Sequence, residues 1–365
     1  LVDSYLKVED WRVKENSTVT YSVGGLILSN SGAITANYWL SEVYDREIAD
    51  AHRNAEIHIH DLSMLTGYCA LKQLIQEGLG GIPGKVTSKP ASHLSSLCNQ
   101  MVNFLGIMQN EWAGAQAFSS FDTYLAPFVR TDNLTYKEVK QCIESFVFGV
   151  NTPSRWGTQA PFSNITLDWV CPPDLKDQPA IVGGKEQDFT YGDCQHEMDL
   201  VNKAFIEIMI EGDANGRGFQ YPIPTYSITS DFDWSETENN KLLFEMTSKY
   251  GTPYFSNYIN SDMEPSDVRS MCCRLRLDLR ELRKKSGGFF GSGESRGSVG
   301  VVTINMPRIA YQAENEVDFY ARLDHLMDLA ARSLKTKRTV ITKFLEAGLY
   351  PYTKRYLGTF DNHFS

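Results

Sequence analysis

The stretch FSNITLDW (162–169), together with DLVNKAFIEIMIEG (199–212) and YPIPTYSIT (221–229), decides the fold class. The first and third runs are short, largely apolar and bounded by turn residues, which is typical of strands. The second has apolar residues three and four positions apart, which predicts a helix. Further strands are expected at TPYFSNYI (252–259), CCRLRLD (272–278) and VGVVTINM (299–306), with helices at 237–251 and 317–345. This alternation predicts an α/β sheet or barrel.

The part before residue 160 is expected to be mostly helical. Residues 1–55 indicate helices that are broken by NSTVTYSVGGLILSNSG (16–32), and residues 92–129 predict one long helix or a helical pair. A further helix is expected over 135–151. EIHIHDLSML (56–65) is expected to be a strand that ends in a loop.

Composition excludes several classes of protein. The 365 residues are 42% hydrophobic and 22% charged, which is typical of a globular protein. The net charge of −10 argues against a general nucleic-acid-binding surface. No apolar run is long enough for a membrane span, and no P-loop or dinucleotide-binding motif is present. The glycine-rich run KKSGGFFGSGESRGSVG (284–300) is expected to be a mobile loop.

The seven cysteines form no disulfide framework and no C-x-x-C pair. We therefore expect a reduced, cytoplasmic protein in which most cysteines are small buried residues. The chain begins without Met and ends in a Gly- and Asn-containing turn, so we expect it to be part of a longer polypeptide.

Two sequence segments carry candidate reactive groups. In IHIHD, His58 and His60 are two positions apart on a predicted strand and face the same way, which suits metal ligation or substrate binding as well as a polar strand end. In MCCRL, Cys272 and Cys273 are adjacent, which suits one packed and one reactive cysteine, and Arg274 would favour a thiolate or bind a phosphate.

Polar segments can hold a nucleotide. NTPSRWGTQAPFSN (151–164), PIPTYSIT (222–229) and GTPYFSN (251–257) are rich in hydroxyl and amide groups. At strand ends such groups bind phosphate and ribose, although plain turns have the same composition. The segment DANG (213–216) is interpreted as a turn, because the glutamate of a calcium loop is missing.

Several long motifs resemble one family, the anaerobic (class III) ribonucleoside-triphosphate reductases. They cover nearly the whole chain: HIHD followed by Cys69, QNEWAGAQAFSSFDTYLAPF (109–128), NTPSRWGTQAPFSNITLDW (151–169), YPIPTYSIT, GTPYFSNYI, MCCRLRLD and GVVTINMPRIA. The resemblance implies a ten-stranded α/β barrel of two antiparallel-arranged five-stranded halves with a central finger loop. The whole of 1–365 would be this catalytic barrel, including N-terminal helices over 1–55 and dimer and effector helices over 92–150.

The resemblance also implies site residues. Cys273 matches the finger-loop cysteine whose thiyl radical abstracts the 3′-hydrogen of the ribose, and Cys69 matches the reducing cysteine. Loss of the 2′-hydroxyl as water follows. The expected substrate-binding residues are His58, His60, Ser163, Asn164 and Arg274, and the expected effector-binding residues are Gln100, Gln109, Glu111 and Gln116. No metal site is expected within this chain.

Cofactors and partners follow from the same resemblance. A glycyl radical and a structural zinc site are expected in a C-terminal segment outside this chain. A radical-SAM activase, which uses S-adenosylmethionine and an iron–sulfur cluster, would install the radical. The expected ligands are ribonucleoside triphosphate substrates and ATP or dNTP effectors, and the expected assembly is a homodimer. Gly297–Ser298–Val299 stands where the formate-using branch has Asn, which leaves both formate and a thioredoxin-like protein open as reductant.

Other functions remain open at this point. A barrel metal-dependent hydrolase would use His58-x-His60 as the start of a zinc site. A nucleotide-sensing regulatory protein would need the polar segments but not Cys273. Pyruvate formate-lyase and the diol dehydratases share the implied barrel and differ in the motifs around the cysteine.

Overall fold

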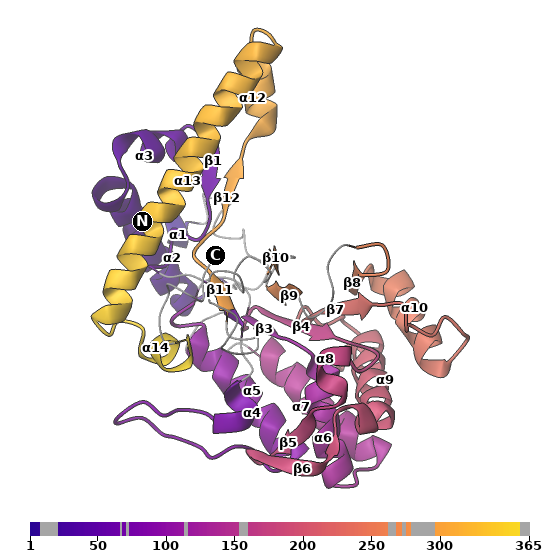
Figure 1. Ribbon diagram of the computed structural model, residues 1–365. Helices are drawn as coiled ribbons and strands as arrows, with labels where there is room; N and C mark the ends of the chain where they lie inside the picture. Colours follow the sequence, from indigo (N-terminus) through magenta and orange to yellow (C-terminus); the bar gives the residue numbers. More distant parts are fainter. Residues whose placement is uncertain are drawn as a thin grey trace.

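A six-stranded sheet lies at the centre of the fold (Figure 1). The computed structural model describes residues 1–7, 21–65, 68–70, 73–112, 116–152, 160–261, 268–271, 275–278 and 296–357. The strand order is β11-β2-β3-β4-β7-β8, and all neighbours are parallel except β11, which is antiparallel to β2. The strands are β11 (Arg296–Ser298), β2 (Tyr68–Ala70), β3 (Gln116–Phe118), β4 (Ser163–Leu167), β7 (Ile223–Ile228) and β8 (Tyr254–Asn257).

Helices connect the parallel strands and cover one face of the sheet. They are α5 (Leu94–Met108), α6 (Phe121–Thr131), α7 (Tyr136–Asn151), α9 (Gln195–Glu211) and α10 (Glu238–Tyr250). Local sequence explains their starts: Thr135 and Glu138 form a capping box before α7, and the Thr237 side chain caps α10. Parallel strands need such crossover helices, because a short turn cannot return the chain to the same edge.

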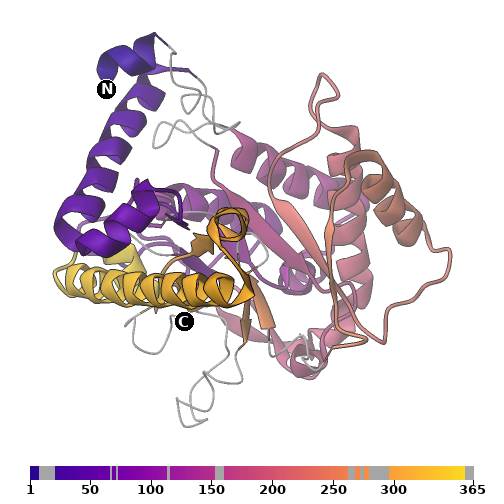
Figure 2. The same cartoon turned by 90° about the horizontal axis from the view of Figure 1, so that it is seen from above.

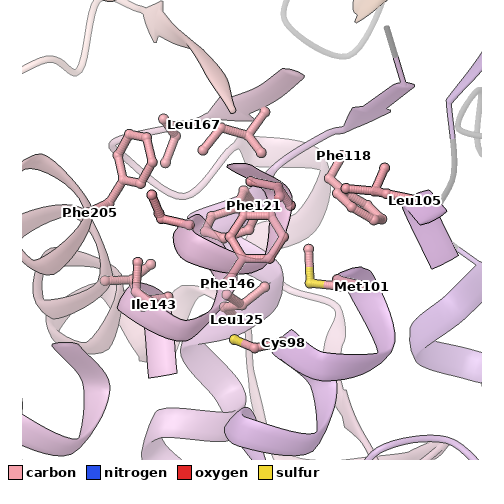
Figure 3. Packing of buried hydrophobic residues seen from close by; sticks show 14 of the residues in the cluster. Cys98, Met101, Leu105, Phe118, Phe121, Leu125, Ile143, Phe146, Leu167 and Phe205 are labelled. Carbon is pink, nitrogen blue, oxygen red and sulfur yellow. The ribbon is translucent and has the colours of Figure 1, made fainter. Parts of the chain in front are cut away.

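The main core lies between this helix layer and the sheet. Phe118 of β3, Leu167 of β4, Phe121 of α6, Phe146 of α7 and Phe205 of α9 converge there (Figure 3). All five are less than a tenth exposed, so their burial supplies much of the hydrophobic stabilisation of this part of the molecule.

A second, smaller body packs around the long helix α13 (Glu316–Glu346). Figure 2 shows α13 and α2 on one side of the molecule and α10 on the opposite side. In this body β1 pairs with β12 in antiparallel register, His58 opposite Thr303. Its elements are α2 (Val23–Tyr38), the π-helix η2 (Trp39–Val43), α3 (Arg46–Arg53), β1 (Ile57–Ile59), β12 (Val302–Ile304) and α12 (Met306–Gln312).

The remaining elements are short. β9 and β10 form an antiparallel pair with Met271 opposite Leu275, and β9 contacts β3. β5 and β6 form a hairpin whose turn is Gly183–Gly184, both at positive φ, a backbone conformation that glycine adopts without strain. The bounds are α1 (Val2–Leu6), α4 (Gln73–Glu77), α8 (Pro173–Lys176), β5 (Pro179–Val182), β6 (Lys185–Thr190), η3 (Gly192–Cys194), β9 (Val268–Met271), β10 (Leu275–Asp278) and α14 (Pro351–Leu357).

The α/β class and most of the expected elements are confirmed, with two differences. Residues 92–129 contain the expected helical pair, α5 and α6, but strand β3, which was not expected, lies between the two helices. VGGLILSNSG does not interrupt the N-terminal helices but forms most of α2, whose first turn is capped by Ser22. The described strands form a six-stranded sheet and three two-stranded pairs and no closed ten-stranded barrel. Most of the glycine-rich run lies outside the described residues.

Candidate functional site

The face of the sheet away from the helices is polar. Strand neighbours at matching positions point to the same face, and successive residues alternate between faces. Phe118, Ile165 and Leu167 belong to the core under the helices, so Ala117, Asn164 and Thr166 project to the other side. The same alternation places further hydroxyls of β7 and β8 beside them: Thr225, Ser227, Tyr254 and Ser256. We call this set of residues the open face.

Register brings the open-face side chains into rows. Thr166 lies opposite Thr225, which lies opposite Tyr254, so three hydroxyls follow one another across three strands. Asn164 begins the neighbouring row, opposite Ile223. None of these residues is charged, but the Asn164 row continues through Ala117 and Ala70 to Arg296 of β11.

Three of these polar groups are buried although they lie on the side of the sheet away from helices α5, α6, α7, α9 and α10. Asn164 is 3% exposed, Thr225 7% and Thr166 8%. Thr166 accepts a hydrogen bond from the Ser120 backbone N–H, whereas the Oδ1 atom of Asn164 has no hydrogen-bond partner. An unpartnered buried amide oxygen costs free energy, which is tolerated where a ligand or an ordered water completes it.

The structure separates the two predicted binding residues of β4. Ser163 and Asn164 are consecutive in a regular strand and therefore face opposite sides of the sheet. Ser163 faces the helices, in register with Gln116 of β3. Of these two residues, Asn164 is therefore the one on the open face.

The segments that carry the two predicted reactive cysteines are described only in part. Cys69 lies in β2, opposite Gly297 of β11, and its side chain lies outside the described residues. Cys273 and Arg274 also lie outside them. The strands on either side of residues 272–274 are described: β9 contacts β3 and lies on the other side of the sheet from α6 and α7 (Figure 1). Strand β9, which precedes residues 272–274 in the chain, therefore lies beside β3.

His58 and His60 belong to a cluster of three histidines in the second body. The ring centroids of His58 and His60 are 4.5 Å apart, and those of His52 and His58 are 5.4 Å apart. The Nε2 atom of His60 lies 2.8 Å from the Thr303 hydroxyl, and the backbone N–H of Ile59 donates to Nδ1 of His52. Burial, followed by the charge of His58, lowers the pKa of both His52 and His60, so these imidazoles are neutral at pH 7.

A buried lysine adjoins this cluster. Lys337 of α13 is 2% exposed, and a Cβ atom on Gly300 would come within 3.2 Å of its amine. Burial lowers the pKa of Lys337 to about 8, with Asp61 acting in the opposite direction. Asp61 itself has a φ of 56°, the left-handed conformation that Asp adopts more readily than most residues. The site around β1 thus combines neutral imidazoles with one buried amine.

A buried carboxylate lies at the carboxyl end of β4. Asp122 of α6 is fully buried and accepts hydrogen bonds from the backbone N–H groups of Thr123, Asp168 and Trp169 and from the Asn202 amide, at 2.8–3.0 Å. Burial raises the pKa of Asp122, and the four donors act against that shift. Because it joins β4, α6 and α9, Asp122 fixes the sheet to its helices next to the open face.

The four predicted effector residues do not form one cluster. Gln100 on α5 donates to Ser88 and Lys89, and Gln109 ends the same helix. The Glu111 carboxylate accepts from the Tyr352 and Thr353 backbone N–H groups at the start of α14. The fourth, Gln116, is buried on β3 facing the helices, and its side-chain amide has no partner. Glu111 and Gln116 therefore lie in the interior, away from the exposed side of α5.

The described cysteine side chains are packed and unreactive. Cys98, Cys142, Cys171 and Cys194 form no disulfide, and all except Cys142 are buried. Burial raises the pKa of Cys171 and of Cys194 to about 12, so both are thiols at neutral pH. Thiolates are the reactive form, which confirms the expectation of structural cysteines for these positions.

Metal and membrane sites are not found in the described part of the chain. No group of three or more His, Cys, Asp or Glu side chains there is placed to hold a metal ion. His58-x-His60 consequently finds no third ligand among those residues. No helix among them is both long and apolar enough to cross a membrane.

Sequence reasoning missed Thr225 and Thr166 as site residues, and also His52 and Lys337. PIPTYSIT was identified as polar, but only strand register shows that Thr225 and Thr166 share a face with Asn164. Lys337 belongs to a helix more than 270 residues from His60 in sequence, and its neighbours TKRT give no periodic signal for a buried lysine.

Comparison with known proteins identifies the family. The family model described as anaerobic ribonucleoside-triphosphate reductase matches residues 15–365. Two curated relatives carry that name, from Haemophilus influenzae and from Escherichia coli. Each is 22% identical, over 342 and 343 residues respectively, with 84% of this chain and 44% of the relative covered. The chain therefore spans less than half the length of these relatives.

Solved structures share the fold. The anaerobic ribonucleotide reductase from Thermotoga maritima with dATP bound in the specificity site superposes with a TM-score of 0.71 at 19% identity. The same enzyme in complex with dATP and CTP gives a TM-score of 0.67 at 19% identity. Both comparisons cover 99% of this chain and 61% of the other.

Proposed function

Because the chain belongs to the anaerobic ribonucleoside-triphosphate reductase family, we propose that it is part of the catalytic domain of such a reductase. The reaction would convert ribonucleoside triphosphates to 2′-deoxyribonucleoside triphosphates. The match of the family model over residues 15–365 carries this proposal. The fold likeness to a reductase that was solved with CTP and dATP supports it.

The described sheet suits one half of the implied ten-stranded barrel. β2, β3, β4, β7 and β8 are five parallel strands, the number expected in one half. The antiparallel strand β11 follows β10 in the chain and pairs with β2 at the edge, as the first strand of a second half would. The open face would then line the barrel interior, and helices α5 to α10 would form its outer layer. A further segment, outside residues 1–365, would complete the barrel.

The chemistry assigned to the cysteines follows the family. A thiyl radical on Cys273 would abstract the 3′-hydrogen of the ribose, the 2′-hydroxyl would leave as water, and Cys69 would take part in the two-electron reduction that completes the step. The anchoring of β9 beside β3, and the position of Cys69 in the adjacent strand β2, support this pairing. The glycyl radical, expected outside this chain, would supply the unpaired electron. A barrel interior excludes water, which radical chemistry requires.

We also propose binding roles for amide, guanidinium and imidazole side chains of this chain. Asn164 on the open face would contact the substrate, with Arg274 near the reacting cysteine. His58 and His60 would contribute imidazole groups at the end of β1, where Nε2 of His60 lies 2.8 Å from the Thr303 hydroxyl. α5, with Gln100 and Gln109, would lie in the region of a homodimer interface that binds dNTP effectors.

The remaining components are proposed from the family alone. They are a radical-SAM activase with its S-adenosylmethionine and iron–sulfur cluster, a zinc site in a further segment, and a reductant. The reductant is either formate, which would be oxidised to carbon dioxide, or a thioredoxin-like dithiol, which would become a disulfide.

Turnover of labelled CTP tests the proposal. The full-length protein that contains this chain is produced anaerobically, activated by its radical-SAM partner and assayed for dCTP with formate or with a thioredoxin system. We expect dCTP with one of the two reductants, and its loss in Cys273→Ser and in Cys69→Ser. Cys98→Ser is the matched control, because Cys98 is a packed, unreactive cysteine. Absence of dCTP in the presence of a detectable glycyl radical contradicts the proposal.

A further inference from the structure

A short bend, residues 299–301, joins the main sheet to the second body. Strand β11 precedes the bend and pairs with β2, with Gly297 opposite Cys69. Strand β12 follows the bend and pairs with β1, with Thr303 opposite His58. The bend therefore sets where the strand of one candidate cysteine lies relative to the strand of the two candidate histidines.

Backbone contacts and one helix hold this bend. The Ser298 hydroxyl donates to the Gly300 carbonyl at 3.3 Å, and the His60 backbone N–H donates to the Val301 carbonyl at 3.0 Å. On the other side, Gly300 lies against Lys337 of α13. A Cβ atom at Gly300 would come within 3.1 Å of Cδ and 3.2 Å of Nζ of Lys337. The absence of a side chain at position 300 thus permits the close approach of the bend to the amine.

The Lys337 amine lies in a built, buried environment. Lys337 is 2% exposed, and its Nζ atom lies over the ring of the fully buried Trp39, 6.0 Å from the centroid. Among the described residues, Asp61 and His60 are the titratable groups whose charges interact with it. The amine is therefore enclosed by an aromatic ring, the polar end of β1 and the bend.

Stability does not account for a lysine at this position. Burial lowers the pKa of Lys337 to about 8, so at pH 7 the amine is charged and its burial costs free energy. An apolar side chain of the same length would fill the same space without this cost. Groups that oppose stability are typical of functional sites. A cation in a place without water interacts strongly with the backbone dipoles beside it, and here that backbone is the bend.

We propose that Lys337 is a positioning residue of the reductase: its charged amine holds the bend at residues 299–301, and so fixes β11 beside Cys69 relative to β12 beside His58. This inference rests on the proposed reductase function and adds a residue that acts on the reaction through the backbone, without touching the substrate. Loss of the charge slows turnover, because a displacement of about 1 Å at reacting groups can reduce a rate by about a hundredfold.

The matched pair Lys337→Met and Lys335→Met tests this role in the full-length protein. Methionine keeps the length of the lysine side chain without its charge, and Lys335 is exposed on the same helix. Formation of dCTP from labelled CTP is measured with the reductant that supports the wild type. Rates are divided by the glycyl-radical content, determined by electron paramagnetic resonance. At pH 7, Lys337→Met is expected to be about ten- to hundredfold slower than the wild type, and Lys335→Met to match it.

The pH dependence shows whether the charge is responsible. The Lys337 amine loses its proton as pH rises through about 8. The ratio of the wild-type rate to the Lys337→Met rate is therefore expected to fall by about fivefold or more between pH 7 and pH 9.5. Other titrating groups are present in both proteins and cancel in this ratio. A residue that only fills space would give the same ratio at both pH values.

Gly300→Ala tests the same contact from the side of the bend. Its methyl group would press on the Lys337 side chain, so slower turnover is expected although the amine is intact. Wild-type rates for Lys337→Met or for Gly300→Ala overturn the inference while the reductase function stands. A rate ratio that does not change with pH overturns it, and so does a melting temperature of Lys337→Met far below the wild-type value, which marks a packing role. A wild-type protein that carries the glycyl radical and forms no dCTP overturns the proposed function itself.

Discussion

The two faces of strands β4 and β7 differ although both are buried. The helix-facing side carries Ile165, Leu167 and Tyr226, all fully buried in the main core. The opposite side, away from helices α5 to α10, carries Asn164, Thr166 and Thr225. The first face stabilises the fold through apolar burial, and the second contributes little to stability and keeps polar groups available. Fold and function are thus divided between alternate residues of the same strands.

Asp122 fixes β4 to helices α6 and α9, and its removal is expected to have the largest effect. Asp122→Ala leaves three backbone N–H groups buried without their acceptor and removes one of the two acceptors of the Asn202 amide. We expect a loss of about 3–5 kcal/mol in the free energy of unfolding, the range for breaking a buried charged network. Calorimetry on the full-length protein measures this, with Asp188→Ala as the control, because Asp188 is exposed on β6. A melting temperature for Asp122→Ala close to that of Asp188→Ala would show that the four hydrogen bonds do not hold the helices to the sheet.

The next largest effect on stability is expected from replacing Lys337, which lies in the second body. Burial lowers its pKa from 10.5 to about 8 in the folded protein, so below pH 8 the folded state bears the full cost of a buried ammonium. This cost is about 3 kcal/mol and decreases as pH rises from 8 towards the unfolded value, so stability rises with pH in that window. Lys337→Met is therefore expected to unfold at a higher temperature than the wild type at pH 7.5.

The pH dependence separates this effect from ordinary packing. The advantage of Lys337→Met is expected to shrink at pH 9.5, because the wild-type amine is then neutral. Lys335→Met, two residues away on the exposed side of α13, is expected to match the wild type at both pH values. If Lys337→Met raises the melting temperature by the same amount at pH 7.5 and at pH 9.5, the wild-type amine is not buried in its charged form.

The contrast between the two faces explains which strands could be predicted from the sequence. The runs around Ile165 and Tyr226 predicted strands correctly, because burial on the helix-facing side leaves a local apolar signal. Strand β3 was missed, since its three residues lie within an apolar pattern that continues from α5 into α6. Short strands in parallel sheets are specified by their neighbours in space, which periodicity does not contain.

The residues of the candidate site, like the short strands, could be predicted only where their own sequence motif identifies them. Asn164 and His60 could be selected from their motifs, and the structure places Asn164 on the open face. The resemblance implied both Ser163 and Asn164, which as consecutive strand residues lie on opposite faces of the sheet. Thr225 and Lys337 required the register of β4 with β7 and the packing of α13 on Gly300. Cys273 and Arg274 lie outside the described residues, so their assignment stays a prediction.

The smallest expected effect concerns a polar atom on the apolar face. The Tyr226 hydroxyl is fully buried and has no hydrogen-bond partner, so Tyr226→Phe removes a group that only costs desolvation. We expect the melting temperature to stay unchanged or to rise, by an amount worth at most about 1 kcal/mol. Tyr136→Phe is the matched comparison, because the Tyr136 hydroxyl donates to Glu207 at 2.6 Å and its loss should lower the melting temperature. If both substitutions destabilise equally, an ordered water pairs with Tyr226, and the helix-facing side is less strictly apolar than the comparison of the two faces requires.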